Sequence, residues 1–165
     1  MIEDYINIDF YGGNDNSLGI SSIQDLLSED DIEVSKNGGE KMQKSLSDNL
    51  NETLETLAGI SGFIAAGVYN GSGDILATND KKGFKFDEIG SLALELYKDA
   101  TSISDKMGLG LCNFIETHTK EYIFIHMCII PGKGAIGVLL GSDGNIGLAR
   151  HQMRKEGERL IPDFK

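Results

Sequence analysis

Residues 122–160, near the C-terminal end of the chain, consist of five successive pieces: YIFIHMCII (122–130), PGKG (131–134), AIGVLL (135–140), GSDGN (141–145) and IGLARHQMRKEGERL (146–160). The first and third pieces are apolar strands around a short turn, and the last is a basic helix that follows a second turn. Neither strand alternates cleanly between apolar and polar residues, which is typical of a sheet covered on both faces. We therefore expect a small sheet with helices on both faces. Such an arrangement usually presents a surface to other proteins and has no cleft for a substrate.

Similar patterns extend back to the middle of the chain. Apolar residues every three or four positions predict a first helix that ends at Gly59, and the turn Asn70-Gly71-Ser72-Gly73 predicts a hairpin. Because the links between strands are short, pairing is largely antiparallel and the fold class is α+β, in the order α-β-β-α-β-β-β-α. In chain order the predicted elements are a helix over 41–58, strands over 63–69 and 74–78, a second helix capped by Asp87, strands over 109–116, 122–130 and 135–140, and a third helix over 145–160.

The second and third helices each show an apolar and a polar side. In the second helix we expect the buried stripe to be Ile89, Leu92, Ala93, Leu96, Ala100 and Ile103. In the third helix, capped by Asn145 or Asp143, we expect the inward residues to be Ile146, Ala149, Met153 and Leu160, and those facing water to be Arg150, Arg154, Lys155 and Arg159.

Residues 1–40 form an N-terminal leg that carries most of the charge. The leg holds ten acidic residues and one basic residue, so it accounts for −9 of the total net charge of −11. A nucleic-acid partner is not expected, because phosphate neutralisation needs a basic surface. We divide the chain into an acidic, flexible extension over 1–40 and one domain over 41–165. The leg is either a solvated tail or, as the alternation of Ile6, Ile8 and Phe10 with polar residues allows, a segment that docks on a partner or on its own sheet edge.

The sequence contains no recognisable catalytic, cofactor or metal site. The GKG at 132–134 is followed by Ala135 and a strand, whereas a phosphate-binding loop needs Ser or Thr and then a helix. The three histidines are scattered rather than placed at metal-ligand spacing. His126 and Cys128 share a strand face, but their apolar neighbours favour packing over a nucleophile pair. We expect no enzyme activity, no cofactor and no bound metal.

Length, cysteines and hydropathy indicate the compartment. A chain of 165 residues with 40% hydrophobic residues has room for one domain. Its two cysteines, Cys112 and Cys128, are too few for a disulfide framework and are expected to be free thiols in a reducing compartment. We find no signal peptide and no apolar run approaching the roughly 20 residues that span a bilayer. We expect a cytoplasmic protein without membrane insertion.

Three pieces of the sequence resemble the Roadblock/dynein light chain family. They are GFIAAGVYNGSGDILAT (62–78), YIFIHMCIIPGKGAIGVLL (122–140) and NIGLARHQMRKEGERL (145–160), and the match extends over residues 42–161. The Asn-x-Gly-Leu-x-Arg opening of the last piece is most similar to the prokaryotic Mgl-type branch. The resemblance implies a profilin-like, five-stranded antiparallel sheet with the first and third helices on one face and the second on the other. It also implies a homodimer in which the third strands and second helices of two subunits meet.

The resemblance also implies a partner. Mgl-type members bind small Ras-like GTPases and regulate nucleotide turnover by reshaping the switch regions, without supplying a catalytic arginine. This favours a non-enzymatic regulator, and the alternative is a structural adaptor with no effect on GTP hydrolysis. The candidate partner-binding residues are Phe84, Phe86, Glu88, Ser91, Glu95, Lys98, Asp99 and Ser102. Alternatively, the polar members form a plain solvated face and the two phenylalanines pack down on the sheet.

Overall fold

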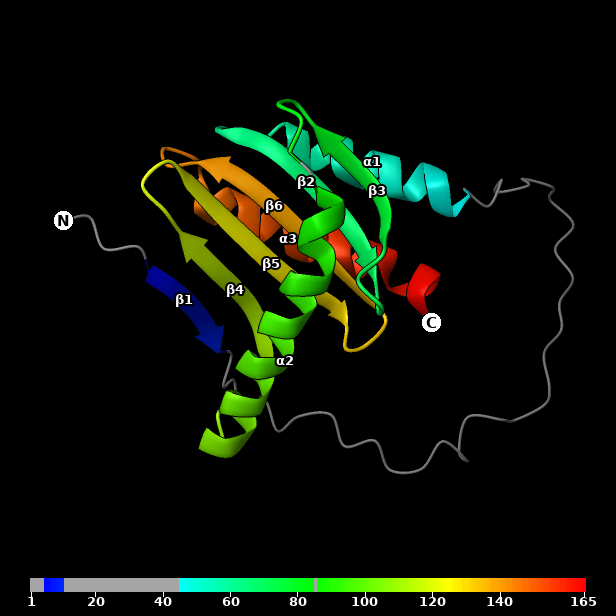
Figure 1. Ribbon diagram of the computed structural model, residues 1–165. Helices are drawn as coiled ribbons and strands as arrows, with labels where there is room; N and C mark the ends of the chain where they lie inside the picture. Colours follow the sequence, from blue (N-terminus) through cyan, green and yellow to red (C-terminus); the bar gives the residue numbers. More distant parts are fainter. Residues whose placement is uncertain (1–4, 11–44, 85) are drawn as a thin grey trace, which may run out of the picture. The chain divides into compact units, whose positions relative to one another are not determined.

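The computed structural model describes residues 5–10, 45–84 and 86–165 (Figure 1). Single 3-10 turns precede the second long helix and follow the third. In chain order the elements are β1 (Tyr5–Phe10), α1 (Leu46–Ala58), β2 (Phe63–Asn70), β3 (Ile75–Asp80), α2 (Ile89–Met107), β4 (Cys112–His118), β5 (Tyr122–Ile130), β6 (Gly134–Gly141) and α3 (Ile146–Leu160).

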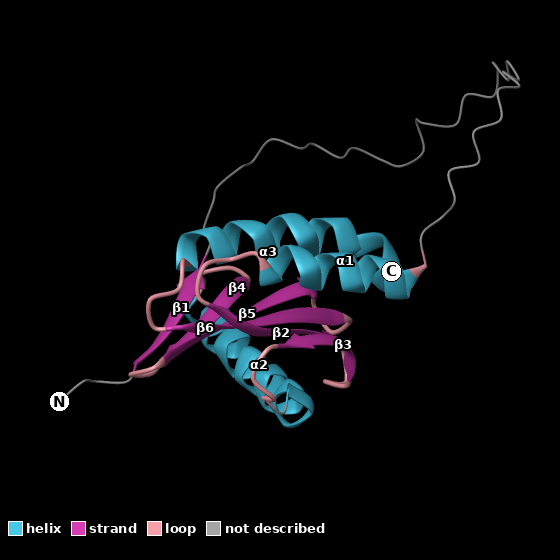
Figure 2. Ribbon diagram, turned by 90° about the horizontal axis from the view of Figure 1, so that it is seen from above, coloured by secondary structure: helices cyan, strands magenta, loops and turns pink. Residues whose placement is uncertain are grey.

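The strands form one sheet in the order β1-β4-β5-β6-β2-β3, and every neighbouring pair is antiparallel. Helices α1 and α3 lie on one face of this sheet and α2 lies on the other (Figure 2). The predicted α+β fold is confirmed for the five strands β2–β6 and the three helices. The sheet differs from the prediction in having a sixth strand, β1, at its edge.

Local hydrogen bonds explain where the helices and the first hairpin begin. The Ser45 hydroxyl accepts from the Asp48 amide at 3.2 Å, and the Asp48 carboxylate accepts from the Ser45 amide at 3.3 Å, which is a capping box for α1. The Asn70 side-chain oxygen accepts from the amides of Ser72 and Asp74 and closes the β2–β3 turn. Of the two caps considered for α3, Asn145 is the one observed, at 2.9 Å from the Leu148 amide.

Three predicted boundaries are wrong for identifiable reasons. The first helix begins at Leu46 rather than at residue 41, because Ser45 is its N-cap. The N-cap of α2 is Glu88 rather than Asp87, and it makes no side-chain capping bond because a 3-10 turn leads into the helix. The third of the predicted strands begins at Cys112 rather than at residue 109. The preceding residues complete the end of α2: Gly108 has φ 68°, and the Leu109 amide donates to the Ser104 carbonyl at 3.0 Å.

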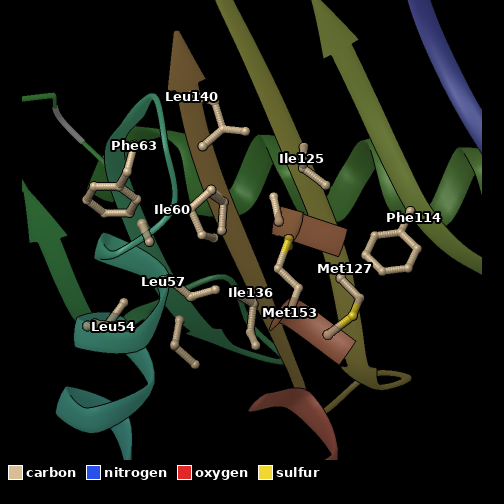
Figure 3. Packing of buried hydrophobic residues seen from close by; sticks show 14 of the residues in the cluster. Leu54, Leu57, Ile60, Phe63, Phe114, Ile125, Met127, Ile136, Leu140 and Met153 are labelled. Atoms are coloured by element: carbon tan, nitrogen blue, oxygen red, sulfur yellow. The ribbon is translucent and has the colours of Figure 1, made fainter. Parts of the chain in front are cut away.

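The main hydrophobic core lies between the sheet and the helices α1 and α3 (Figure 3). Leu54 and Leu57 of α1 and Met153 of α3 are almost fully buried there. They pack in one cluster with strand residues such as Ile125 and Ile136. This burial confirms the predicted apolar sides of the first and third helices, except at Leu46, which is 42% exposed at the start of α1. It also explains the apolar character of this face of the sheet.

The polar side of α3 is less exposed than predicted. Arg159 bonds to Glu156 on its own helix and to Glu52 and Thr53 of α1, at 2.7–2.9 Å. Its guanidinium therefore ties the two helices together, instead of facing water. The carboxylate of Glu156 is itself buried, so the ion pair neutralises a charge inside the structure.

Arg150, also expected to face water, turns toward the sheet. Its Nε donates to Glu116 of β4 at 2.6 Å, and His118 Nε2 lies 3.2 Å from the same carboxylate. Glu116 is only 1% exposed, so the arginine supplies the countercharge that lets a carboxylate sit in this position. Arg154 also contacts β4, with its guanidinium 5.0 Å from the centroid of the Phe114 ring. Helix α3 thus anchors β4 through two arginines.

The N-terminal leg contributes β1. Its residues pair with β4 from Tyr5 opposite His118 to Phe10 opposite Cys112, with one irregularity between Asp9 and Phe10. Of the two alternatives for the leg, docking on the protein's own sheet edge is therefore observed for this segment. The other residues of the leg lie outside the described part of the chain, so their predicted flexibility stays a prediction. Met42 and the first residues of the predicted 41–58 helix also lie outside it.

We predict that Arg159→Ala lowers the free energy of unfolding by about 2 kcal/mol, because Glu156 would keep its buried charge without the guanidinium. Urea unfolding followed by circular dichroism measures the change. The matched control is Lys155→Ala, an exposed residue on the same helix, for which we expect a change below about 0.5 kcal/mol. Equal stability of the two variants would contradict the structural role given to Arg159.

Candidate interaction surface

Helix α2 crosses the face of the sheet opposite α1 and α3 (Figures 1 and 2). Small side chains let it approach closely: Gly90, Ala93, Ala100 and Ser104 are all buried. A Cβ atom added at Gly90 would lie 2.3 Å from the Gly73 carbonyl oxygen, in the β2–β3 turn. No side chain larger than hydrogen therefore fits at this contact without a shift of the backbone.

This close approach determines which residues of α2 are buried, and it corrects the predicted stripe. Ala93 and Ala100 are buried as expected, whereas Leu92 is 64% exposed and Ile103 is 49% exposed. The helix faces the sheet with its small residues and Tyr97, and the larger aliphatic residues are turned to one side. Apolar spacing alone could not separate these two neighbouring stripes.

We define the α2 apolar stripe as Leu92, Leu96, Ile103 and Met107. Its spacing of four, seven and four residues places the four side chains on one side of the helix. Leu96 is half-buried and packs against a cluster that includes Cys112 and Ile115 of β4, so the stripe lies on the side of α2 that borders β4. Leu111, immediately before β4, is also exposed. Contiguous exposed apolar side chains mark interaction sites.

The polar candidates lie beside the α2 apolar stripe. All six of them are exposed, on α2 or, for Glu88, directly before it, so they are available to a partner. Lys98 and Ser102 also line an open hollow of about 480 Å³ with Tyr97 and Thr101. The six exposed polar candidates are Glu88, Ser91, Glu95, Lys98, Asp99 and Ser102.

The two phenylalanine candidates belong to the interior rather than to this surface. Phe86 is 2% exposed and covers Gly67 of β2, where an added Cβ would lie 2.8 Å from the Phe86 ring. It therefore cannot serve as an exposed anchor for a partner. Phe84 is half-buried, with its ring 5.6 Å from that of Tyr122 at 78°. Packing down on the sheet, the alternative given for both residues, is what the structure shows.

A buried histidine lies among aromatic rings on the α2 side of the sheet. The His126 ring centroid is 6.2–6.4 Å from those of Tyr69, Tyr97 and Phe124, and the side chain is 2% exposed. Neither ring nitrogen has a hydrogen-bond partner among the described residues. Burial disfavours the charged imidazolium and lowers the pKa of His126 to about 4. His126 is thus a neutral packed residue, as predicted, and burial raises the pKa of the neighbouring Cys128 thiol.

The described residues form no obvious site for chemistry. They contain no group of three or more His, Cys, Asp or Glu side chains that could hold a metal. A second open hollow, of about 420 Å³, lies beside α3 and is lined by residues such as Asn113, Met127 and Arg154. Neither hollow is lined by a histidine that could activate a cysteine or a serine. None of the helices within the described ranges is both long enough and apolar enough to span a bilayer.

Solved structures share this architecture. A Roadblock/LC7 domain from Streptomyces avermitilis aligns with 73% of this chain and 98% of its own length, at a TM-score of 0.62 and 14% identity. The chain has the Roadblock fold. Myxococcus xanthus MglB aligns with 73% of this chain and 98% of its own length, at 0.64 and 11% identity. An MglB described as having a tetrameric arrangement aligns with 71% of this chain and 88% of its own length, at 0.65 and 12% identity.

Neither the family models nor the curated proteins compared with the sequence match it. The identities to the solved structures are low enough that the likeness establishes the Roadblock fold and nothing further. At this level the resemblance stated from the sequence is confirmed.

We predict that His126 makes stability depend on pH between about 6.5 and 4. The folded protein takes up a proton at this ring only near pH 4, whereas the unfolded chain does so near the ordinary histidine value of about 6.5. The free energy of unfolding should therefore fall by about 3 kcal/mol as the pH drops through this window, with no further loss from this group below it.

Urea unfolding at a series of pH values tests this dependence. A His126→Phe variant keeps an aromatic ring in place and should lose the contribution, while a variant of the exposed His151, His151→Gln, should retain it. The same pH profile in wild type and His126→Phe would contradict the assignment.

Proposed function

We propose that this chain is a non-catalytic, homodimeric protein that binds a small Ras-like GTPase and modulates its nucleotide cycle. The observation that carries the proposal is the exposed outer side of α2, where the α2 apolar stripe runs beside a row of exposed polar side chains. The Roadblock fold shared with MglB supports it, because the Mgl-type resemblance implies such a partner.

The α2 apolar stripe supports the homodimer. Its exposed leucine, isoleucine and methionine side chains form a continuous surface that a second copy would cover with the same residues. A two-fold contact of this kind is self-complementary, so each subunit contributes an identical patch. Joining two α2 helices would leave the polar candidates on the outside of the pair, as a platform for a larger partner.

The positions of the arginines support a regulator that supplies no catalytic arginine. The chain contains three arginines, Arg150, Arg154 and Arg159, and all of them lie on α3. Helix α3 covers the face of the sheet opposite α2 (Figure 2). Arg150 and Arg159 are moreover engaged by buried carboxylates. A GTPase on the α2 platform would therefore receive no arginine to stabilise transition-state charge, and any effect would act through the GTPase's own switch segments.

The decisive experiment measures single-turnover GTP hydrolysis and nucleotide release by the cognate Ras-like GTPase, with and without this protein. We expect a change in at least one rate that saturates with concentration. A triple variant of the platform, Glu95→Lys, Asp99→Lys and Ser102→Lys, should weaken the effect by about tenfold or more, because it reverses the local charge. Binding without any change in rate would favour the structural adaptor, and absence of both binding and rate change would refute the proposal.

The homodimer is tested separately by sedimentation velocity. We expect Leu92→Asp with Ile103→Asp to weaken self-association by at least about a hundredfold, because both charges would be buried in the contact. The matched control is Ser91→Asp with Ser102→Asp, which adds the same charge to the same helix on its polar side. Unchanged self-association of the first variant would exclude the α2 apolar stripe from the interface.

A further inference from the structure

The edge of β4 that faces away from β5 is occupied by β1. The register runs from Tyr5 opposite His118 to Phe10 opposite Cys112, so β1 covers the whole length of β4. Among the described elements, β1 packs extensively against β4 alone. The backbone pairing with this neighbour is therefore the contact that a competing strand would have to replace.

Strand β4, by contrast, is held from several directions. The Glu116 carboxylate accepts from Arg150 of α3, and the Phe114 ring lies under the Arg154 guanidinium. On the other face, Ile115 and Cys112 pack in the cluster beneath α2. The loss of β1 would remove one neighbour from β4 and leave these contacts intact. It would expose a straight edge of unpaired amides and carbonyls, which is a ready template for another strand.

The α2 apolar stripe borders this same edge. Leu96 of the stripe packs against the cluster that contains Cys112 and Ile115 of β4. The family resemblance implies a homodimer in which the third predicted strands, β4 here, of two copies meet, and an antiparallel β4–β4 pairing would be two-fold symmetric. Such a pairing would also bring the two stripes onto the same side of the joined sheet. The edge and the stripe thus form one surface, of which β1 covers only the strand part.

From this arrangement we infer that β1 and a second copy of the chain compete for the edge of β4. This inference rests on the homodimer of the proposed function and adds its regulation. With β1 docked, two copies can meet through the α2 apolar stripe alone, and the contact is weak. When β1 leaves, β4 and the stripe act together, and the dimer is tight.

The size of the effect follows from the fraction of molecules in which the edge is open. The apparent dissociation constant equals the intrinsic one divided by the competent fraction. If β1 holds the edge in about nine molecules of ten, the β4 edge of each copy is open for pairing in about one molecule of ten. Self-association is then weakened by about tenfold for each copy that must open. Any partner that captures β1 would strengthen the dimer to the same extent.

The test disrupts β1 in the full-length chain. Along an edge strand, successive amides point alternately toward the neighbouring strand and away from it, so Asn7→Pro with Ile8→Pro removes at least one donor from the β1–β4 ladder. The control, Asn14→Pro with Asn16→Pro, places two prolines in the leg outside β1 and leaves the charge unchanged. Sedimentation equilibrium should show self-association of the β1 variant that is about tenfold or more tighter than that of the control.

Hydrogen exchange gives a second readout. When wild type is concentrated enough to dimerise, amides of residues 5–10 should lose protection while those of residues 112–118 keep it. Unchanged or weaker self-association of the β1 variant overturns the inference, and weaker association would mean that β1 itself is exchanged between copies. Protection of residues 5–10 that persists in the dimer overturns it as well.

The GTPase assay separates this inference from the function on which it rests. If the β1 variant associates no more tightly than the control but wild type still alters the nucleotide rates, the competition is refuted and the proposed function stands. If the β1 variant forms the tighter dimer but neither protein binds the GTPase, the homodimer and the competition stand and the proposed GTPase regulation is refuted.

Discussion

The close contact of α2 with the sheet is the constraint on which the outer surface of the protein depends. Gly90 lies so near the β2–β3 turn that any larger side chain would meet the backbone of Gly73. Ala93 and Ala100 continue the same small-residue face. Because the helix lies on its small residues, its large aliphatic side chains have no room beneath it and are displaced to the flank. The exposed apolar side chains of α2 are thus a consequence of this packing.

Sequence patterns predicted most of the fold because its elements are locally encoded. The capping box at Ser45, the Asn70 turn and the Asn145 cap are short-range signals that fix where elements begin. The burial of α2 was predicted less well, since two apolar stripes lie side by side on it and only the shape of the sheet selects between them. The six polar candidates are exposed, as binding to a partner requires, and their binding role stays a prediction, whereas Phe86 was assigned to the surface although it is buried over Gly67.

Long-range contacts account for the remaining differences. Arg150 and Arg159 carry charges that sequence periodicity assigns to solvent, yet Arg150 pairs with Glu116 of β4, and Arg159 pairs with Glu52 of α1 as well as with Glu156 on its own helix. No pattern within α3 could reveal Glu116, which is 34 residues away in the sequence. The position of β1 is of the same kind. The alternation of Ile6, Ile8 and Phe10 allowed an extended segment, but the choice of the β4 edge depends on an open strand encoded far along the chain.

The pairing of β1 with β4 also has a consequence for biosynthesis. During translation, residues 5–10 leave the ribosome more than a hundred residues ahead of the strand with which they pair. At the usual 5–20 residues per second, this segment waits for roughly 5–20 s without its partner. It waits inside a strongly acidic stretch, where like charges on neighbouring nascent chains repel one another. The negative charge of the leg therefore opposes the association of β1 segments on neighbouring nascent chains of one polysome.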